Sequence, residues 1–184
     1  ELMGKDQIRQ EVTEKIKNLS QEGHQAISQD LFNQLVQTEQ WQQASVIGLT
    51  MSDGLEWETR PIIEQAWKEG KKVAVPKAIK KGSQMDFRQI DSFDQVEAGF
   101  AGISEPDPDQ TQALAPEEID LLVVPGRVFT PEGYRIGFGG GFYDRYLAKF
   151  DNPTISLVWQ GQLTDHLPTD KYDLPVQELL ISEL

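Results

Sequence analysis

The residues best suited to chemistry lie in one segment that ends at position 145. Arg135 and Arg145 flank a run with glycine at positions 137, 139, 140 and 141. Glycine lets backbone amides approach a ligand closely, and successive amides at a helix N-terminus bind anions. Arginine suits bidentate contacts to phosphate, and the carboxylate of Asp144 is a hard oxygen ligand of the kind that magnesium prefers. Together these residue types predict phosphoryl transfer from a magnesium-bound nucleotide.

Two common nucleotide-binding motifs do not fit this segment. The dinucleotide pattern G-x-G-x-x-G, started at Gly137, requires glycine at position 142, where the chain has Phe142. The loop before it is also too long for the tight turn that directly follows a strand in that motif. No G-x-x-x-x-G-K-S/T occurs in the sequence, which excludes a P-loop.

The elements expected to position this segment alternate between helices and strands. Apolar residues at helical spacing predict helices at 5–19, 24–38, 60–69 and 141–150. Short apolar runs predict strands at 46–49, 72–75, 121–124, 154–158 and 179–181, and weak alternation predicts another at 85–90. Thr59 is expected to cap a helix that Gly70 ends, and Pro76 to stop a strand. Residues 99–116 and 126–140 are expected to be long loops.

This alternation predicts an α/β fold, a three-layer α/β/α single domain over residues 3–184 with a largely parallel central sheet. Residues 121–124 are apolar at every position, which suits a central parallel strand covered on both faces. Ligands of such sheets bind beyond the carboxyl ends of the strands. Glu1 and Leu2 precede Met3 and are expected to be a cloning remnant.

Composition and charge narrow the function classes. The 184 residues, 38% hydrophobic and 26% charged, suit one globular domain, and no apolar stretch is long enough to span a membrane. A net charge of -13 argues against binding to nucleic acid or to an anionic membrane. The absence of cysteine excludes disulfides and thiolate chemistry and favours a cytoplasmic location. Because the chain has few cations, the positions of its Lys and Arg residues indicate where an anionic ligand would bind.

The ordered string from Pro125 to Arg145 makes a family resemblance specific. It contains P-G-x-x-F followed by G-x-R-x-G-x-G-x-G-x-Y-D-R, and it is similar to the signature of 5-formyltetrahydrofolate cyclo-ligases, also called methenyltetrahydrofolate synthetases. Further matches to this family follow in order along nearly the whole chain. They are Lys5 with Arg9, Glu58-Thr59, Val75-Pro76-Lys77, Met85-Asp86-Phe87, Gly102-Ile103-Ser104-Glu105-Pro106, and Leu167-Pro168 with Asp173.

The resemblance implies an enzyme that converts 5-formyltetrahydrofolate to 5,10-methenyltetrahydrofolate and consumes ATP with Mg²⁺. It implies phosphorylation of the formyl oxygen, attack by N10, and release of ADP and phosphate. The small-molecule partners would be the folate and ATP, and the chain would be a monomer or weak homodimer. The family's ATP-binding positions correspond to Lys5, Arg9, Arg135, Gly137, Gly139, Gly140, Gly141, Phe142, Tyr143, Asp144 and Arg145.

The same resemblance assigns the remaining roles. Asp144 and Asp173 would hold magnesium, and Glu58, Met85 and Tyr143 would contact the folate. The catalytic set would be Arg135, Asp144 and Glu58. From the sequence alone, Glu58 is equally compatible with capping the helix that follows it.

Four positions depart from the family pattern. Phe138 and Gly140 stand where some members have basic residues, Arg127 stands where the residue is usually apolar or small, and Gln177 replaces a second aspartate found in many members. These departures bear on the phosphate contacts and the metal shell. Two other functions stay open: a sugar-phosphate isomerase or CoA-transferase relative that needs no ATP, and a folate-binding protein without turnover.

Overall fold

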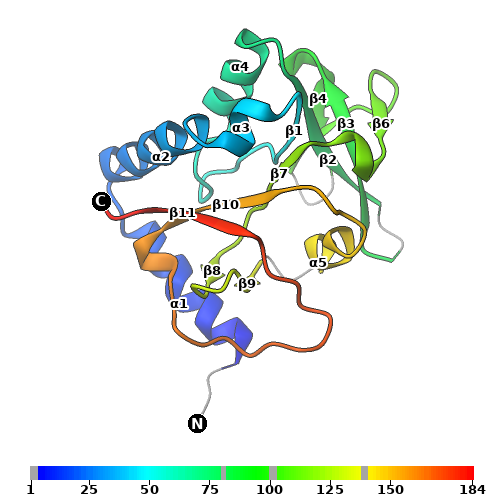
Figure 1. Cartoon of the computed structure of the whole chain (residues 1–184). Helices are drawn as coiled ribbons and strands as arrows, with labels where there is room; N and C mark the ends of the chain where they lie inside the picture. The colour runs from blue at the N-terminus through cyan, green and yellow to red at the C-terminus, as the bar shows by residue number, and fades with distance from the viewer. Residues whose placement is uncertain (1–3, 80–81, 100–102, 138–140) are drawn as a thin grey trace.

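A seven-stranded sheet forms the centre of the molecule, in the order β11-β10-β7-β1-β2-β3-β6 (Figure 1). This computed structural model describes residues 4–79, 82–99, 103–137 and 141–184. The strands from β11 to β2 pair in parallel, whereas β3 and β6 pair antiparallel, so the sheet is largely parallel, as expected. In chain order they are β1 (Val46–Gly48), β2 (Lys72–Ile79), β3 (Gln84–Ile90), β6 (Gln112–Leu114), β7 (Leu121–Val123), β10 (Thr154–Trp159) and β11 (Glu178–Ser182).

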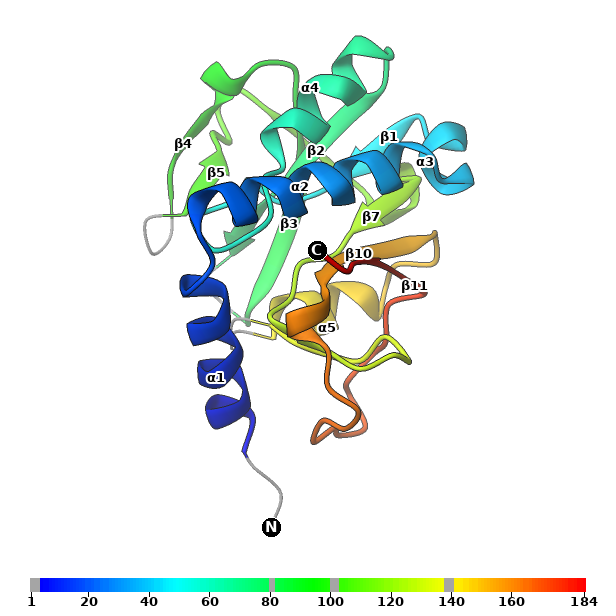
Figure 2. The ribbon, with the colours of Figure 1, turned by 90° about the vertical axis from the view of Figure 1, so that its left-hand side faces the viewer.

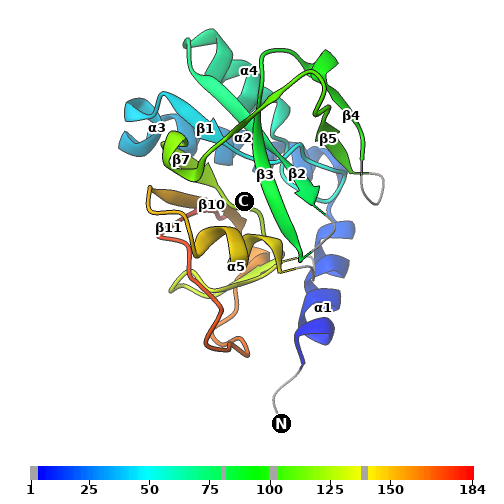
Figure 3. The same ribbon diagram turned by 90° about the vertical axis from the view of Figure 1, so that its right-hand side faces the viewer.

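Helices cover both faces of this sheet, which confirms the three-layer architecture. Figure 2 shows one face with α1 (Lys5–Lys17), α2 (Gln21–Val36), α3 (Glu39–Gln43) and α4 (Arg60–Lys68), and Figure 3 shows α5 (Phe142–Leu147) on the other. The short 3₁₀ helices among the described residues are η1 (Phe93–Gln95), η3 (Pro116–Glu118) and η4 (Gln160–Gln162). Among the described helices, none is long and apolar enough to cross a bilayer.

The two cores follow from the alternation of side chains along each strand. Val73 and Val75 pack in the core between the sheet and helices α1 to α4, whereas Ala74 between them packs on the side of α5. In the same way Leu121 and Leu122 face opposite cores. A strand that is buried on both faces needs apolar residues throughout, which explains the apolar run at 121–124.

The expectation that Pro76 stops a strand is wrong, because β2 continues to Ile79. Ala74 directs its carbonyl toward β1, where it accepts from the Leu49 N–H at 3.1 Å. The backbone nitrogen of Pro76 also points toward the side of β1, but it lies beyond the end of that strand. The N–H that proline lacks is therefore not needed for a hydrogen bond to β1. Two residues further on, the Ala78 N–H on that side donates to the carboxylate of Glu105 at 2.7 Å.

The two expected loops contain short strands. Within 99–116 lie β5 (Ser104–Pro106), which pairs with β4 (Val96–Ala98), and β6. Within 126–140, β8 (Val128–Phe129) pairs with β9 (Arg135–Ile136) as a hairpin. Strands of two or three residues are too short to display an alternating pattern, and α3 is likewise too short for helical periodicity.

Side chains at two helix starts differ from expectation. The Ser20 hydroxyl accepts from the Gly23 N–H at 2.9 Å, so α2 begins at Gln21 rather than near position 24. Thr59 occupies the N-cap position of α4 but makes no capping bond there. Its hydroxyl instead donates to the Thr50 carbonyl at 2.7 Å and accepts from the Ser52 N–H at 3.0 Å. These bonds pin the 50–59 segment beyond the end of β1. The Gly70 φ of 81° ends α4 as expected.

Candidate active site

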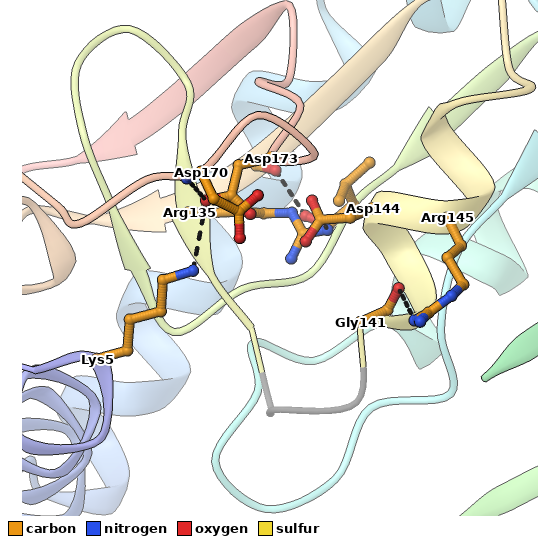
Figure 4. Close-up of polar contacts among 9 residues, drawn as sticks. Lys5, Arg135, Gly141, Asp144, Arg145, Asp170 and Asp173 are labelled. Carbon is orange, nitrogen blue, oxygen red and sulfur yellow. Dashed lines mark hydrogen bonds and ion pairs between the residues drawn. The ribbon is translucent and has the colours of Figure 1, made fainter. Parts of the chain in front are cut away.

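The centre of the candidate site is Arg135 on β9, whose side chain is only 4% exposed (Figure 4). Its Nη2 lies 3.8 Å from Oδ1 of Asp144, which makes an ion pair but not a hydrogen bond. Among the described residues, neither Nε nor Nη2 of Arg135 has a hydrogen-bond partner. Burial lowers the pKa of Arg135, while the negative charges of Asp144 and Asp173 oppose that change. Buried N–H donors without partners are costly, so this guanidinium is suited to an incoming anion.

Two carboxylates flank this arginine from different parts of the chain. Asp144 lies in the first turn of α5 with its side chain 30% exposed, and Asp173 lies between η4 and β11 with its side chain 14% exposed. Asp173 accepts from Lys5 Nζ at 3.3 Å and from the Asp170 N–H at 2.9 Å. The described residues contain no cluster of three or more acidic, His or Cys groups that could hold a metal. Two carboxylates suffice for Mg²⁺ when phosphate oxygens and water complete its octahedron.

Besides Lys5, helix α1 contributes a second cation, Arg9, which reaches Gly137 at the start of the glycine-rich segment. Arg9 Nε donates to the Gly137 carbonyl at 2.9 Å, and Arg9 Nη1 pairs with Asp6 at 2.6 Å. Gly139 and Gly140 lie outside the described residues. Gly141 has a φ of +70°, a backbone conformation that favours glycine.

Arg145 is not brought into the group around Arg135. It is exposed, and its Nη1 donates weakly to the Gly141 carbonyl at 3.4 Å, so it folds back onto the start of its own helix. Figure 4 shows it on the far side of α5 from Asp173. The structure therefore joins Lys5, Arg135, Asp144 and Asp173, and separates Arg145 from them.

Three of the expected contact residues lie on the α5 side of the sheet. The Tyr143 hydroxyl is buried without a partner among the described residues, and burial raises the pKa of this phenol. Its ring centroid lies 5.4 Å from Arg135 Cζ, within cation–π range. Met85 is buried, and Phe142 packs against the same apolar cluster. Tyr143 thus lies between this apolar cluster and the guanidinium of Arg135.

A small cavity of about 40 Å³ lies beyond the carboxyl ends of β1 and β7. Its polar lining includes Thr50, Glu56, Arg127 and Gln162. The Thr50 hydroxyl donates to Oε2 of Glu56 at 3.2 Å. Burial, and then the charge of Asp53, raise the pKa of Glu56 to about 7, while Thr50 and Arg127 act in the opposite direction. A carboxyl that titrates near neutral pH inside a cavity is typical of functional sites.

Glu58 lies elsewhere. It is exposed, and its backbone N–H donates to the Ser28 hydroxyl at 3.1 Å. It lines a separate groove of about 380 Å³ between the 54–58 segment and the junction of α1 with α2. The structure does not bring Glu58 together with Arg135 or Asp144. Glu56, which the sequence did not single out, faces the cavity instead, and only its place two residues before Glu58 could have drawn attention to it.

The positions that depart from the family pattern fall in different places. Arg127 lines the cavity with Glu56. Gln177 exchanges hydrogen bonds with Thr154 at the start of β10, at 2.9 and 3.4 Å, so its amide helps to join β10 and β11. Phe138 and Gly140 lie outside the described residues.

The open, largely parallel sheet with a buried guanidinium between two carboxylates is typical of an α/β enzyme, and this arrangement is suited to an anionic ligand. The model of the 5-formyltetrahydrofolate cyclo-ligase family matches residues 2–182. The chain belongs to this family, whose members are ring-forming ligases. The expected family resemblance and enzyme class are thereby confirmed.

Individual relatives cover nearly the whole chain. The 5-formyltetrahydrofolate cyclo-ligase of Haemophilus influenzae is 30% identical over 96% of this chain and 97% of its own. The mouse enzyme is 27% identical over 96% and 92%. The structure of Aquifex aeolicus 5,10-methenyltetrahydrofolate synthetase superposes with a TM-score of 0.85 at 30% identity, over 97% of this chain and 90% of that one. The Mycoplasma pneumoniae synthetase, at 22% identity and a TM-score of 0.78, supports the fold.

Proposed function

We propose that this protein converts 5-formyltetrahydrofolate to 5,10-methenyltetrahydrofolate and uses ATP and Mg²⁺ to do so. The observation that carries the nucleotide part is the buried guanidinium of Arg135, which has two nitrogens without partners among the described residues. An anionic ligand satisfies such donors, and arginine matches the geometry of phosphate oxygens. The names of the relatives support the folate part.

The chemistry explains why a nucleotide is needed. A formamide oxygen is a poor leaving group, and N10 of the folate is a weak nucleophile. In the proposed reaction the formyl oxygen attacks the γ-phosphorus and ADP leaves. N10 then attacks the formyl carbon and loses its proton, and the oxygen departs with phosphate. The protein needs mainly to align the reactants and to stabilise the transferring negative charge.

The triphosphate would lie against Arg135, Lys5, Arg9 and the amides of the glycine segment. Lys5 pairs with Asp173 and Arg9 reaches the Gly137 carbonyl, so both cations already border this segment. Mg²⁺, when bound, would neutralise charge on the phosphates. We expect Asp144 and Asp173 to hold it, since both carboxylates lie close enough to Arg135 to affect its pKa. Mg²⁺ and the three cations would thereby offset most of the negative charge of the triphosphate and the two carboxylates.

On the folate side, we propose Glu56 with Tyr143 and Met85, since Glu58 is exposed in a separate groove. A carboxyl group can accept hydrogen bonds from the N–H groups of a pteridine. The cavity of about 40 Å³ is far smaller than the roughly 300–1,000 Å³ of small-molecule sites. The segment that carries Leu55 and Glu56 is therefore expected to move outward when the folate binds.

A direct assay tests this proposal. The protein is mixed with 5-formyltetrahydrofolate, ATP and magnesium, and the near-ultraviolet absorbance of the methenyl product is followed. We expect a rise that requires all three components. Turnover without nucleotide would point to different chemistry, and folate binding without turnover under any condition would indicate a storage protein.

A further inference from the structure

The side chain of Gln162 joins three segments that lie beyond the carboxyl ends of β1, β7 and β10. It lines the small cavity and is 2% exposed. Its Oε1 accepts from the indole N–H of Trp57 at 3.0 Å and from the backbone N–H of Trp159 at 2.8 Å. Its Nε2 donates to the carbonyls of Gly126 and Arg127 at 3.3 and 3.2 Å. The buried amide thus uses both of its donors and both lone pairs of its oxygen.

The chemistry of these partners fixes the orientation of the amide. An indole N–H and a backbone N–H can only donate, and carbonyl oxygens can only accept, so the oxygen faces the first pair and the nitrogen faces the second. A glutamate at this position would bring a carboxyl oxygen toward two carbonyl oxygens. A methionine would have a similar length but would leave all of these buried groups without a partner.

On one side, the amide is attached to backbone that is itself fixed. Gln162 ends η4, and two residues later the Thr164 N–H donates to the carbonyl of Phe129 in β8 at 2.9 Å. In the loop after β7, the N–H of Arg127 donates to the carbonyl of Ile136 in β9 at 2.7 Å. The segment after β1 is therefore the part that the amide positions.

Trp57 is the point at which this segment is held. It is buried, and its ring centroid lies 4.8 Å from that of His24. It directly follows Leu55 and Glu56, which line the cavity. The N–H groups of those two residues donate to Asp53 within the same segment, at 3.1 to 3.3 Å. The segment is thus anchored to the rest of the site at Trp57, while Leu55 and Glu56 bond locally.

We propose that Gln162 is a positioning residue of the cyclo-ligase site, which acts through Trp57 to anchor the segment that carries Leu55 and Glu56 beside the loop after β7. The assignment of the cavity to the folate rests on the proposed function, whereas the effect of Gln162 on Trp57 does not. With this end fixed, Leu55 and Glu56 can move outward for the folate and return to one arrangement. Without the amide, the fixed end is released, and the loss falls on folate binding because the hydrogen bonds of Gln162 go to the cavity walls.

The first readout is deuterium exchange of the Trp57 indole N–H, followed by NMR on protein isotope-labelled at tryptophan, with Trp57→Phe used to assign the signal. We expect this exchange to be at least about tenfold faster in Gln162→Met, which removes the acceptor of the indole. Gln160→Met is the matched control. It makes the same change at an exposed residue of the same 3₁₀ helix, whose amide donates to the Glu183 carbonyl at 2.9 Å, and it should leave the Trp57 signal unchanged.

The second readout separates positioning from a general loss of stability. In Gln162→Met, KM for 5-formyltetrahydrofolate should rise about tenfold, whereas KM for ATP should change less than about twofold. Asn152→Leu is the destabilised control, since it removes a hydrogen bond to the Ile119 carbonyl at 2.7 Å before the start of β10, at the opposite end of the strand from the cavity. It should leave both KM values unchanged.

An indole N–H of Trp57 that exchanges equally slowly in wild type and in folded Gln162→Met would overturn the proposal, as would an equal rise of KM for folate and for ATP. If Gln162→Met does not fold, Trp57→Phe decides, because it removes the other partner of the same bond. A rise of KM for the folate alone in that variant supports the proposal, and an unchanged KM refutes it. A protein without cyclo-ligase turnover, in which Trp57 responds to Gln162→Met but not to Gln160→Met, would refute the proposed function and support the effect of Gln162 on Trp57.

Discussion

The guanidinium of Arg135 lies 3.8 Å from the carboxylate of Asp144, yet the nitrogen nearest to that carboxylate makes no hydrogen bond with any described residue. A buried charge paired at this distance is only partly compensated for its lost hydration. In the proposed function, the arrangement would hold donors in place for a phosphate at some cost to the stability of the free protein. Such a trade between stability and activity is common at functional sites.

Replacing Arg135 by methionine should lower kcat/KM for ATP by about 100-fold or more, because a charged donor to the transferring phosphate is lost. The free energy of unfolding should stay unchanged or rise by about 1 kcal/mol, since the buried charge is removed. Steady-state kinetics and urea denaturation measure the two effects. Arg88→Met is the control: Arg88 donates to the Thr111 hydroxyl and carbonyl at 2.9 and 2.6 Å, so that variant should lose stability and keep activity. A destabilised Arg135→Met would contradict the argument.

Asp144→Asn should abolish most turnover, by about 100-fold or more, and leave folate binding largely intact, because the carboxylate is assigned to magnesium. Turnover as a function of magnesium concentration and folate binding by calorimetry provide the two readouts. Asp151→Asn, a change at an exposed position, is the matched control. Equal activity of wild type and Asp144→Asn at saturating magnesium would rule out the metal role.

Glu56 and Glu58 offer a paired test of which glutamate contacts the folate. Glu56→Gln should raise KM for 5-formyltetrahydrofolate about tenfold, since a hydrogen bond to a charged group contributes about 1.5–3 kcal/mol. Glu58→Gln, at an exposed position, should change it less than about twofold. The absorbance assay at varied folate concentration separates the two variants. The reverse order would assign the folate contact to Glu58.

The raised pKa of Glu56 also predicts how stability changes with pH. Burial raises it from 4.5 to about 7, so between these values the unfolded chain has lost a proton that the folded chain keeps. The unfolded state then binds fewer protons, and the free energy of unfolding falls as pH rises through this interval. Wild type should lose up to about 3 kcal/mol relative to Glu56→Gln and show no further loss above about pH 7. Denaturant titrations across this interval test it, and a pH-independent difference between the two proteins would contradict it.

Two glycines with positive φ should respond differently to alanine. Gly70 has a φ of +81° and open space where a Cβ would lie, so Gly70→Ala should cost about 1 kcal/mol. Gly133 has a φ of +98°, and a Cβ there would clash with the Val176 carbonyl oxygen. Gly133→Ala should therefore cost clearly more, and it should displace the segment that carries Asp173. Thermal unfolding of the two variants gives the comparison, and equal costs would show that the backbone contact relaxes freely.

Much of the fold was predictable because the long elements carry a local signal. The periodicity of apolar residues predicted α1, α2 and α4 to within a few residues. The apolar run at 121–124 predicted that β7 lies in the centre of the sheet. Arg135 and Asp144 could be singled out together since they stand nine positions apart in one motif-bearing segment. Such signals are contained in the spacing of neighbouring residues.

Only the tertiary structure decided which distant groups meet. Lys5 pairs with Asp173 because α1 and the segment before β11 lie side by side, a contact between nearly opposite ends of the chain. Pro76 stays within β2 because β1 ends beside it. Glu56 rather than Glu58 faces the cavity because the 50–59 segment is irregular, and hydrogen bonds such as that of Thr59 to Thr50 set its direction. The sequence thus determined the elements and the residue types of the site, whereas packing determined which side chains converge, since irregular backbone carries no periodicity from which a side chain's direction follows.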